Sequence, residues 1–242
     1  MDIMRKHFTV GFAGLTIEIE TVSSCVCVLC RNYLKEGKPD FKVQVTQDDV
    51  ERECKLSGQK HLDKSSAELG AVYRKIAEAV LDYDMLLMHG AVIALDDAAY
   101  MFSASSGTGK TTHIRLWLNK MDNAYVVNGD KPLVQISDDN VLVCGTPWSG
   151  SEHLNTNVIK PLKAIVLLER SDNNYIEEIS FSQAYPKVLE QTYIPREAEK
   201  ARKALSLLLS MQGKVSFYRF HCNNYKDDCF EVAYKAITEN NK

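Results

Sequence analysis

A glycine-rich run in the middle of the chain constrains the fold and the function more than any other feature of the sequence. Residues 104–112 read Ala-Ser-Ser-Gly-Thr-Gly-Lys-Thr-Thr and fit the phosphate-binding pattern GxxxxGK(S/T), with Ala104 in place of the first glycine. That pattern needs a strand before the loop and a helix after it. Residues 98–102 predict the strand, and residues 111–119 predict the helix. A glycine-rich turn without a function, which is the alternative, does not explain the Lys-Thr that follows the glycines.

Each residue type in this loop has a physical role. Gly107 and Gly109 allow the backbone to take positive φ and to approach a phosphate closely. The N–H groups at the start of the following helix then point at the anion. The Lys110 side chain can reach the terminal phosphates, and the Thr111 hydroxyl is placed to bind Mg²⁺. We therefore predict a nucleotide-binding loop formed by Ser105, Ser106, Gly107, Thr108, Gly109, Lys110, Thr111 and Thr112.

A loop of this kind needs a carboxylate on a neighbouring strand, which holds the metal or accepts a proton. Residues 124–127 predict a strand, and Asp130 follows it closely. An ordinary turn aspartate is the alternative. The pair Asp138-Asp139 is a weaker candidate, because it lies between two short strands, where an exposed hairpin tip is expected.

The order of the expected elements indicates an α/β fold with mixed, largely antiparallel sheets and flanking helices. Residues 1–84 predict strands, one of them over 22–30, and then an amphipathic helix that begins at a capping box of Ser65 and Glu68. We expect this segment to pack on a core formed by residues 85–242. The first two strands of the core, 85–95 and 98–102, must be antiparallel, because their connection is too short for a parallel crossover.

Further elements are expected after the loop. Residues 133–136 and 141–144 predict a hairpin. The remaining pattern predicts strands at 162–168 and 215–220 and helices at 186–192, 196–211 and 228–237.

Composition narrows the class of protein. The chain has 242 residues, of which 45% are hydrophobic and 25% charged, as is typical of a globular protein and not of a disordered one. Its formal net charge is 29 − 32 = −3, without the basic excess of nucleic-acid-binding proteins. The N-terminus lacks the apolar stretch of a signal peptide, and no stretch is long enough to cross a bilayer. We therefore expect a cytoplasmic protein that binds neither nucleic acid nor a membrane.

The seven cysteines agree with a reducing compartment, because an odd number leaves at least one of them unpaired within the chain. Cys27 and Cys30 have the CxxC spacing of a metal or redox site. No second such pair follows to complete four ligands. We therefore favour buried, inert cysteines over a zinc or redox site.

Residues 85–170 resemble a known family. The antiparallel strand pair before the loop is unlike the parallel sheet of the usual P-loop NTPases. The loop itself closely resembles the phosphate loop of the carboxykinases, His89-Gly90 resembles the histidine-glycine of HPr kinases, and Asn155-Thr156-Asn157 is faintly similar to the carboxykinase Asn-Thr-Arg segment. In these features the chain is similar to the family that unites HPr kinase/phosphorylase with phosphoenolpyruvate carboxykinase.

The resemblance implies the fold of the HPr kinase C-terminal domain and an ATP- and Mg²⁺-dependent phosphotransferase. The acceptor would be a Ser or Thr hydroxyl of a small protein or peptide, and a homo-oligomer is left open. Lys110 would hold phosphates, and Thr111 and Asp130 would bind Mg²⁺. Asp130 or Glu152 would take the acceptor proton. His89 would lie beside the phosphates, unless it is an ordinary core histidine.

The chain also departs from the family. It reads Gly129-Asp130-Lys131 where the carboxykinases read Gly-Asp-Asp, so one carboxylate is missing. It is too short for the carboxykinase substrate domain, and the Arg-Gly-Leu-Gly-Ile signature of HPr kinases is absent. Two other functions therefore stay open, namely a nucleotide-binding sensor or partner protein without transfer activity and a small-molecule kinase.

Overall fold

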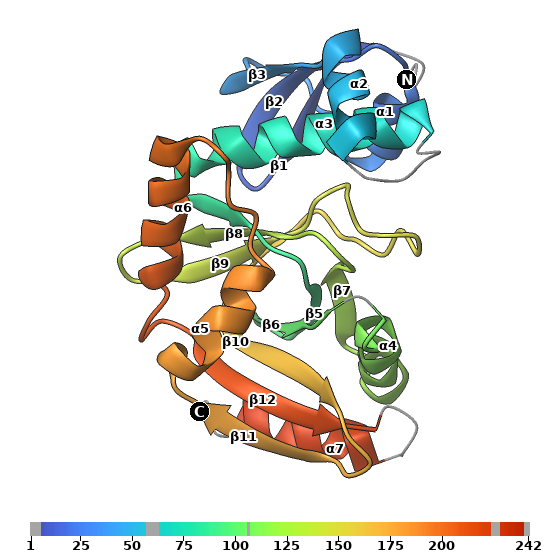
Figure 1. The fold of residues 1–242 in the computed structure, drawn as a ribbon. Helices are drawn as coiled ribbons and strands as arrows, with labels where there is room; N and C mark the ends of the chain where they lie inside the picture. Colours follow the sequence, from blue (N-terminus) through green and yellow to red (C-terminus); the bar gives the residue numbers. More distant parts are fainter. Residues whose placement is uncertain (1–5, 57–62, 106, 224–227, 240–242) are drawn as a thin grey trace. The chain divides into compact units, whose positions relative to one another are not determined.

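The chain folds into a mixture of helices and strands. The computed structural model describes residues 6–56, 63–105, 107–223 and 228–239. Its internal contacts divide the chain into two compact units, Met1–Tyr83 and Asp84–Lys242. In the described residues most strand pairs are antiparallel, and helices accompany the sheet of each unit (Figure 1). The expected mixed α/β class is therefore confirmed.

The first unit is built on a three-stranded sheet. Its first two strands form an antiparallel hairpin, which turns at Ala13 and Gly14, both with positive φ. The third strand pairs in parallel with the second. The elements of this unit are β1 (His7–Phe12), β2 (Leu15–Glu20), α1 (Cys25–Leu29), η1 (Arg31–Tyr33), β3 (Phe41–Gln44), α2 (Gln47–Leu56), α3 (Lys64–Ala79) and η2 (Val80–Tyr83).

The prediction of a strand over residues 22–30 is wrong, because α1 occupies this segment. The buried carboxylate of Glu68 accepts hydrogen bonds from the backbone N–H groups of Val22, at 2.5 Å, and Ser23, at 3.0 Å. It also accepts from the Ser23 hydroxyl. These bonds satisfy donors that a strand would have given to a neighbouring strand. The apolar residues of α1 are buried at helical spacing, on Val26, Cys27 and, one turn on, Cys30.

The capping box expected at Ser65 and Glu68 is also wrong. Asp63 is the N-cap of α3, since its side chain accepts from the N–H groups of Ser65, at 2.8 Å, and Ser66, at 3.4 Å. Glu68 instead points into the unit and caps the chain near Val22. A carboxylate three residues after a Ser therefore served a distant segment and not its own helix.

The cysteines are free thiols. Burial raises the pKa of Cys30 and of Cys144, which keeps both in the protonated form that binds metals poorly. In the part of the chain that the structure describes, no group of three or more His, Cys, Asp or Glu side chains could hold a metal ion. None of the helices described there is long and apolar enough to cross a bilayer.

The second unit contains the phosphate-binding loop. Its strands are β4 (Met85–Leu87), β5 (Ala91–Leu95), β6 (Ala98–Ser103), β7 (Ala124–Asn128), β8 (Leu133–Ile136), β9 (Val141–Cys144), β10 (Ile159–Arg170), β11 (Tyr175–Ile179) and β12 (Ser216–Cys222). They form one curled sheet in the order β4-β8-β9-β10-β6-β5-β7, in which β12 pairs with β10 and β11 with β12. The expected hairpin of β8 and β9 is confirmed.

The prediction of one strand over residues 85–95 is wrong, because the extended structure is interrupted between β4 and β5 and the two strands join different neighbours. β4 pairs with β8, whereas β5 lies between β6 and β7. At the break, the His89 N–H donates to the Gln191 carbonyl, at 2.7 Å, and the Gly90 N–H donates to the Asp130 carbonyl, at 2.9 Å. These two bonds to distant segments replace the bonds of a continuous strand.

The strand directions bring several chain segments to one edge of the sheet. β6 and β7 both pair antiparallel with β5, so they run in the same direction on either side of it. The carboxyl ends of β6 and β7 therefore meet at the edge where β5 begins. β10 pairs in parallel with β6, and β12 pairs in parallel with β10, so these two strands end at the same edge.

A β-bulge interrupts the pairing of β7. Val92 of β5 pairs with Asn128 and Ile93 pairs with Val126, which leaves Val127 as an extra residue on β7. The Val127 carbonyl accepts from the Thr156 N–H at 3.1 Å. The bulge therefore joins the end of β7 to the loop that precedes β10.

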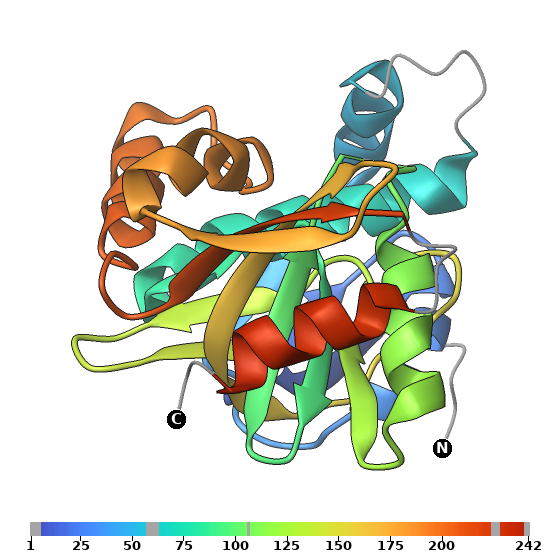
Figure 2. The ribbon, with the colours of Figure 1, turned by 90° about the horizontal axis from the view of Figure 1, so that it is seen from below.

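Helices cover both faces of the strands in this unit. In Figure 2, β11 and β12 lie between two pairs of helices, one on each side. One pair is α5 (Phe181–Glu190) and α6 (Ala198–Leu209), and the other is α4 (Lys110–Lys120) and α7 (Asp228–Tyr234). The π-helical turn η3 (Lys235–Glu239) continues α7. Trp117 of α4 is fully buried against Phe102 and Phe230. The start of the helix expected at 186–192 is wrong, because α5 begins at Phe181, where the N-cap residue Ser180 forms a capping box with Gln183.

Candidate functional site

The glycine-rich loop connects the end of β6 to the start of α4. Gly107, with φ of 77°, and Gly109, with φ of 109°, take the left-handed backbone conformation that other residues adopt only with strain. Gly109 is the N-cap residue of α4, so the first N–H groups of this helix open toward the loop. The strand and helix around the loop are those that the motif predicts. Ser106 lies outside the described residues.

Lys110 is the first residue of α4 and turns back over the loop. Its ammonium group donates to the Ala104 carbonyl at 2.9 Å, and only 9% of the residue is exposed. Burial lowers the pKa of Lys110, and the nearby Asp130 carboxylate opposes this effect. Lys110 thus holds a positive charge at the base of the loop, in an environment where its attraction for an anion is weakly screened.

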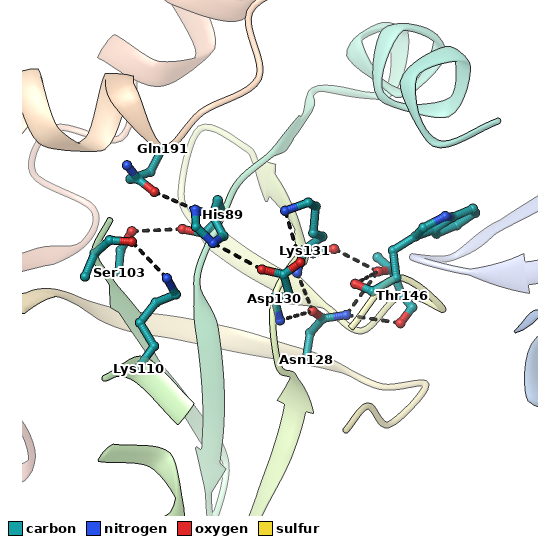
Figure 3. Close-up of polar contacts among 10 residues, drawn as sticks. His89, Ser103, Lys110, Asn128, Asp130, Lys131, Thr146 and Gln191 are labelled. Carbon is teal, nitrogen blue, oxygen red and sulfur yellow. Dashed lines mark hydrogen bonds and ion pairs between the residues drawn. The ribbon is translucent and has the colours of Figure 1, made fainter. Parts of the chain in front are cut away.

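Asp130 lies at the start of the turn after β7, and two basic side chains hold its carboxylate. His89 Nε2 lies 3.1 Å from Oδ1, and Lys131 Nζ lies 3.0 Å from Oδ2 (Figure 3). Burial raises the pKa of Asp130, but the hydrogen bond with His89 and the charge of Lys131 outweigh burial and lower it overall. Asp130 is therefore ionised and fixed in orientation.

Asn128 sets the turn that presents Asp130. Its side-chain oxygen accepts from the backbone N–H groups of Asp130, at 2.9 Å, and Lys131, at 2.6 Å. Its side-chain nitrogen donates to the carbonyl and to the hydroxyl oxygen of Thr146, at 3.1 and 3.0 Å (Figure 3). Asn128 is fully buried, and its side chain stabilises the turn through these hydrogen bonds. Sequence reasoning missed it, although Asn before Gly-Asp is a known signal for an Asx turn.

Gln191 and Ser103 hold His89. His89 Nδ1 lies 2.6 Å from Gln191 Oε1, and the His89 carbonyl accepts from the Ser103 hydroxyl at 2.9 Å (Figure 3). With the backbone bond from the His89 N–H, Gln191 contacts this residue twice. Gln191 was not predicted, because it follows α5 and lies 102 positions away in the sequence. Its role depends on the tertiary fold alone.

A cavity of about 480 Å³ brings most of the predicted residues together. His89, Asp130 and Glu152 line it, and so do the loop residues Gly107, Gly109, Lys110, Thr111 and Thr112. The predicted loop residues Ser105 and Thr108 line a second cavity, of about 350 Å³, on another side of the loop.

Two oxygen donors in the first cavity suit Mg²⁺. The Thr111 hydroxyl and the Asp130 carboxylate both line it, and they are hard ligands of the type that Mg²⁺ prefers. A Mg²⁺ ion that accompanies a nucleotide takes its other ligands from phosphates and water, so one carboxylate and one hydroxyl fit such a site.

Glu152 also lines this cavity, and its side chain pairs with α4. Its Oε2 lies 3.0 Å from Arg115 Nη2, in a largely exposed pair that contributes little to stability. The rejected candidates lie elsewhere, since Asp138 and Asp139 are exposed at the tip of the β8–β9 hairpin.

Comparisons with known proteins add a distant structural similarity. No family model matches the sequence, and no curated protein sequence matches it. Among the solved structures that match is the HPr(Ser) kinase/phosphatase from Coxiella burnetii. It is 9% identical, the alignment covers 64% of this chain and 88% of that chain, and the TM-score is 0.38. A similarity of this size adds nothing to the assignment of a function, which depends on the site itself.

Proposed function

We propose that this protein binds ATP with Mg²⁺ on the loop 104–112 and transfers the γ-phosphate to a Ser or Thr hydroxyl of a small protein or peptide. One observation carries the proposal, namely that the loop, the Lys110 ammonium group and the Asp130 carboxylate share one cavity. Phosphoryl transfer depends mainly on positioning and on charge stabilisation, which these groups can supply. The identity of the acceptor follows from the resemblance of His89-Gly90 and the loop to HPr kinases.

The loop and Lys110 would hold the phosphates. The N–H groups at the start of α4 would bind phosphate oxygens, and Lys110 would neutralise part of their charge. Thr111 and Asp130 would hold the metal, whose positive charge would offset the negative charge that develops on the phosphate oxygens. In this arrangement Lys131 and His89 keep the Asp130 carboxylate ionised and oriented.

The lowered pKa of Asp130 separates the roles of the two carboxylates. A carboxylate that is stabilised in its ionised form is a good metal ligand and a weak base. We therefore assign metal binding to Asp130 and uptake of the acceptor proton to Glu152. In the reaction the acceptor oxygen forms a bond to the γ-phosphorus, the bond from that phosphorus to the β–γ bridging oxygen breaks, the proton passes to Glu152, and ADP leaves.

The proposal is tested with γ-labelled ATP, Mg²⁺ and a library of peptides that contain Ser or Thr. Label on a peptide hydroxyl is the expected result. Binding of ATP without transfer would favour the sensor function, and label on a small metabolite alone would favour the small-molecule kinase. Either outcome would contradict the proposed acceptor.

Nucleotide binding itself is tested by calorimetry on Lys110→Ala. We expect its ATP affinity to fall by at least tenfold, because a buried charge that pairs with phosphate is lost. Lys120→Ala, at the exposed end of the same helix, is the matched control and should bind ATP as the wild type does. Unchanged ATP binding by Lys110→Ala would contradict the proposed role of the loop.

A further inference from the structure

A third cavity, of about 620 Å³, lies on the side of the loop away from Asp130. Its walls come from three parallel neighbours in the sheet, at their carboxyl ends. The loop after β6 supplies Thr108 and Thr112, the chain after β10 supplies Ser171 and Asp172, and the end of β12 supplies Cys222 and Asn223. Crevices at the carboxyl ends of parallel strands are a common place for nucleotides to bind.

This cavity continues the one that contains Asp130. Gly107, Gly109 and Thr112 line both, so the two cavities meet over the backbone of the loop. The 350 Å³ cavity shares no lining residue with the cavity of Asp130 among the residues described. A polyphosphate that lies along the loop with its terminal phosphate near Asp130 therefore has its other end at the 620 Å³ cavity.

The walls of this cavity are fixed to one another and to the loop. The Ser171 N–H donates to the Cys222 carbonyl at 3.1 Å, which joins the end of β10 to the end of β12. The Asn223 N–H donates to Asn174 Oδ1 at 2.7 Å. Arg170 Nη2 donates to the Gly107 carbonyl, so the same wall contacts the glycine-rich backbone. A ligand on the loop would thus meet a wall whose position is set by these three hydrogen bonds.

We propose that this cavity binds the nucleoside end of the nucleotide and that Asp172 accepts hydrogen bonds from the ribose hydroxyls. Asp172 is an exposed carboxylate, which can only accept, and ribose hydroxyls are donors that match it. The volume lies within the roughly 300–1,000 Å³ of small-molecule sites. The inference depends on the proposed function, since it requires the triphosphate to lie on the loop.

The test compares three ligands, each with Mg²⁺, by calorimetry: ATP, 2′,3′-dideoxy-ATP and inorganic tripolyphosphate. The wild type should bind ATP about tenfold more tightly than dideoxy-ATP, since the dideoxy compound lacks the donors. Asp172→Ala should bind ATP only as tightly as dideoxy-ATP, and its affinity for tripolyphosphate should not change. Asp172→Asn, which keeps an acceptor oxygen, should retain part of the preference.

Asp139→Ala is the control, because it removes an exposed carboxylate at the tip of the β8–β9 hairpin. It should show the wild-type preference for ATP. If the wild type binds ATP and dideoxy-ATP equally, or if Asp172→Ala keeps the preference, the proposed contact is wrong although the loop still binds phosphate. If the wild type binds neither ATP nor tripolyphosphate, the proposed function and this inference are both wrong.

Discussion

Nε2 of His89 lies 3.1 Å from Oδ1 of Asp130, and this pair gives the Asp130 carboxylate a fixed orientation. Lys131 follows Asp130 in the sequence, and its ammonium group lies 3.0 Å from Oδ2. The positive charge of Lys131 helps to keep the Asp130 carboxylate ionised, as its proposed role in metal binding requires.

The effect of these partners on Asp130 can be measured as a dependence of stability on pH. Because its pKa is lowered in the folded protein, its contribution to stability is present above the ordinary carboxyl pKa of 3.8 and is lost as the pH falls through the folded value. Asp130→Asn should therefore be less stable than the wild type by roughly 1–2 kcal/mol at pH 7, and the difference should vanish in acid. Urea unfolding followed by tryptophan fluorescence is suitable, since both tryptophans lie in the unit that contains Asp130. A difference that does not change with pH would contradict this origin.

Gln191 is expected to position His89 through its side-chain oxygen. A side-chain amide oxygen can only accept, so His89 Nδ1–H donates to Gln191 while Nε2 faces the Asp130 carboxylate. Gln191→Leu removes the acceptor, while the backbone bond between the two residues remains. We expect altered ¹⁵N chemical shifts of the His89 ring nitrogens and a fall of about tenfold in the rate of transfer.

Gln191→Glu is the matched control for that experiment, because it keeps an acceptor at the same place. It should restore the ring nitrogen shifts toward those of the wild type. Equal spectra for the wild type and Gln191→Leu would show that the side chain does not orient His89.

The buried side chain of His113 leads us to expect a second dependence of stability on pH. It lies on α4, accepts from Trp117 Nε1–H at 3.1 Å and is fully buried. Burial lowers the pKa of His113 from 6.5 to about 3, so the unfolded chain takes up a proton in a range where the folded protein does not. Stability is therefore complete above pH 6.5 and falls as the pH drops toward 3. His113→Gln, which keeps an acceptor without titrating, should flatten this part of the curve in urea unfolding, and an unchanged slope would contradict the assignment.

We expect the Glu68 side chain to stabilise the folded first unit. Its carboxylate accepts from the N–H groups of Val22 and Ser23, and it is almost fully buried. Glu68→Ala leaves these donors without an acceptor, which should lower the free energy of unfolding by about 2–3 kcal/mol. Hydrogen exchange at the two amides is the direct measurement, and it should become faster. Glu51→Ala, an exposed change on α2, should leave both amides protected.

Local chemistry explains which parts of the site the sequence could predict. The glycines, Lys110 and the strand and helix around them form one continuous segment, so their pattern is complete without the rest of the chain. Asp130 was found because it follows a short apolar strand. In both cases neighbours in the sequence determine the structure.

The missed features depend on contacts between distant residues. Glu68 caps a segment 46 positions away, which turns an alternating stretch into α1. Gln191 holds His89 from another helix end, and its backbone carbonyl helps to divide the expected strand into β4 and β5. The edge strand β11 has a mostly exposed pattern with two glutamates, so it lacked the apolar alternation that predicts a strand. Periodicity contains no information about any of these partners.

The extra residue on β7 determines which face of the sheet the next side chain of the strand points to. Side chains along a strand alternate between two faces, and Val127 shifts that alternation by one step before Asn128. Without this residue the Asn128 side chain would point to the opposite face of the sheet, away from the N–H groups of Asp130 and Lys131 that it now binds. The length of β7 therefore determines whether Asn128 can form the turn that presents Asp130.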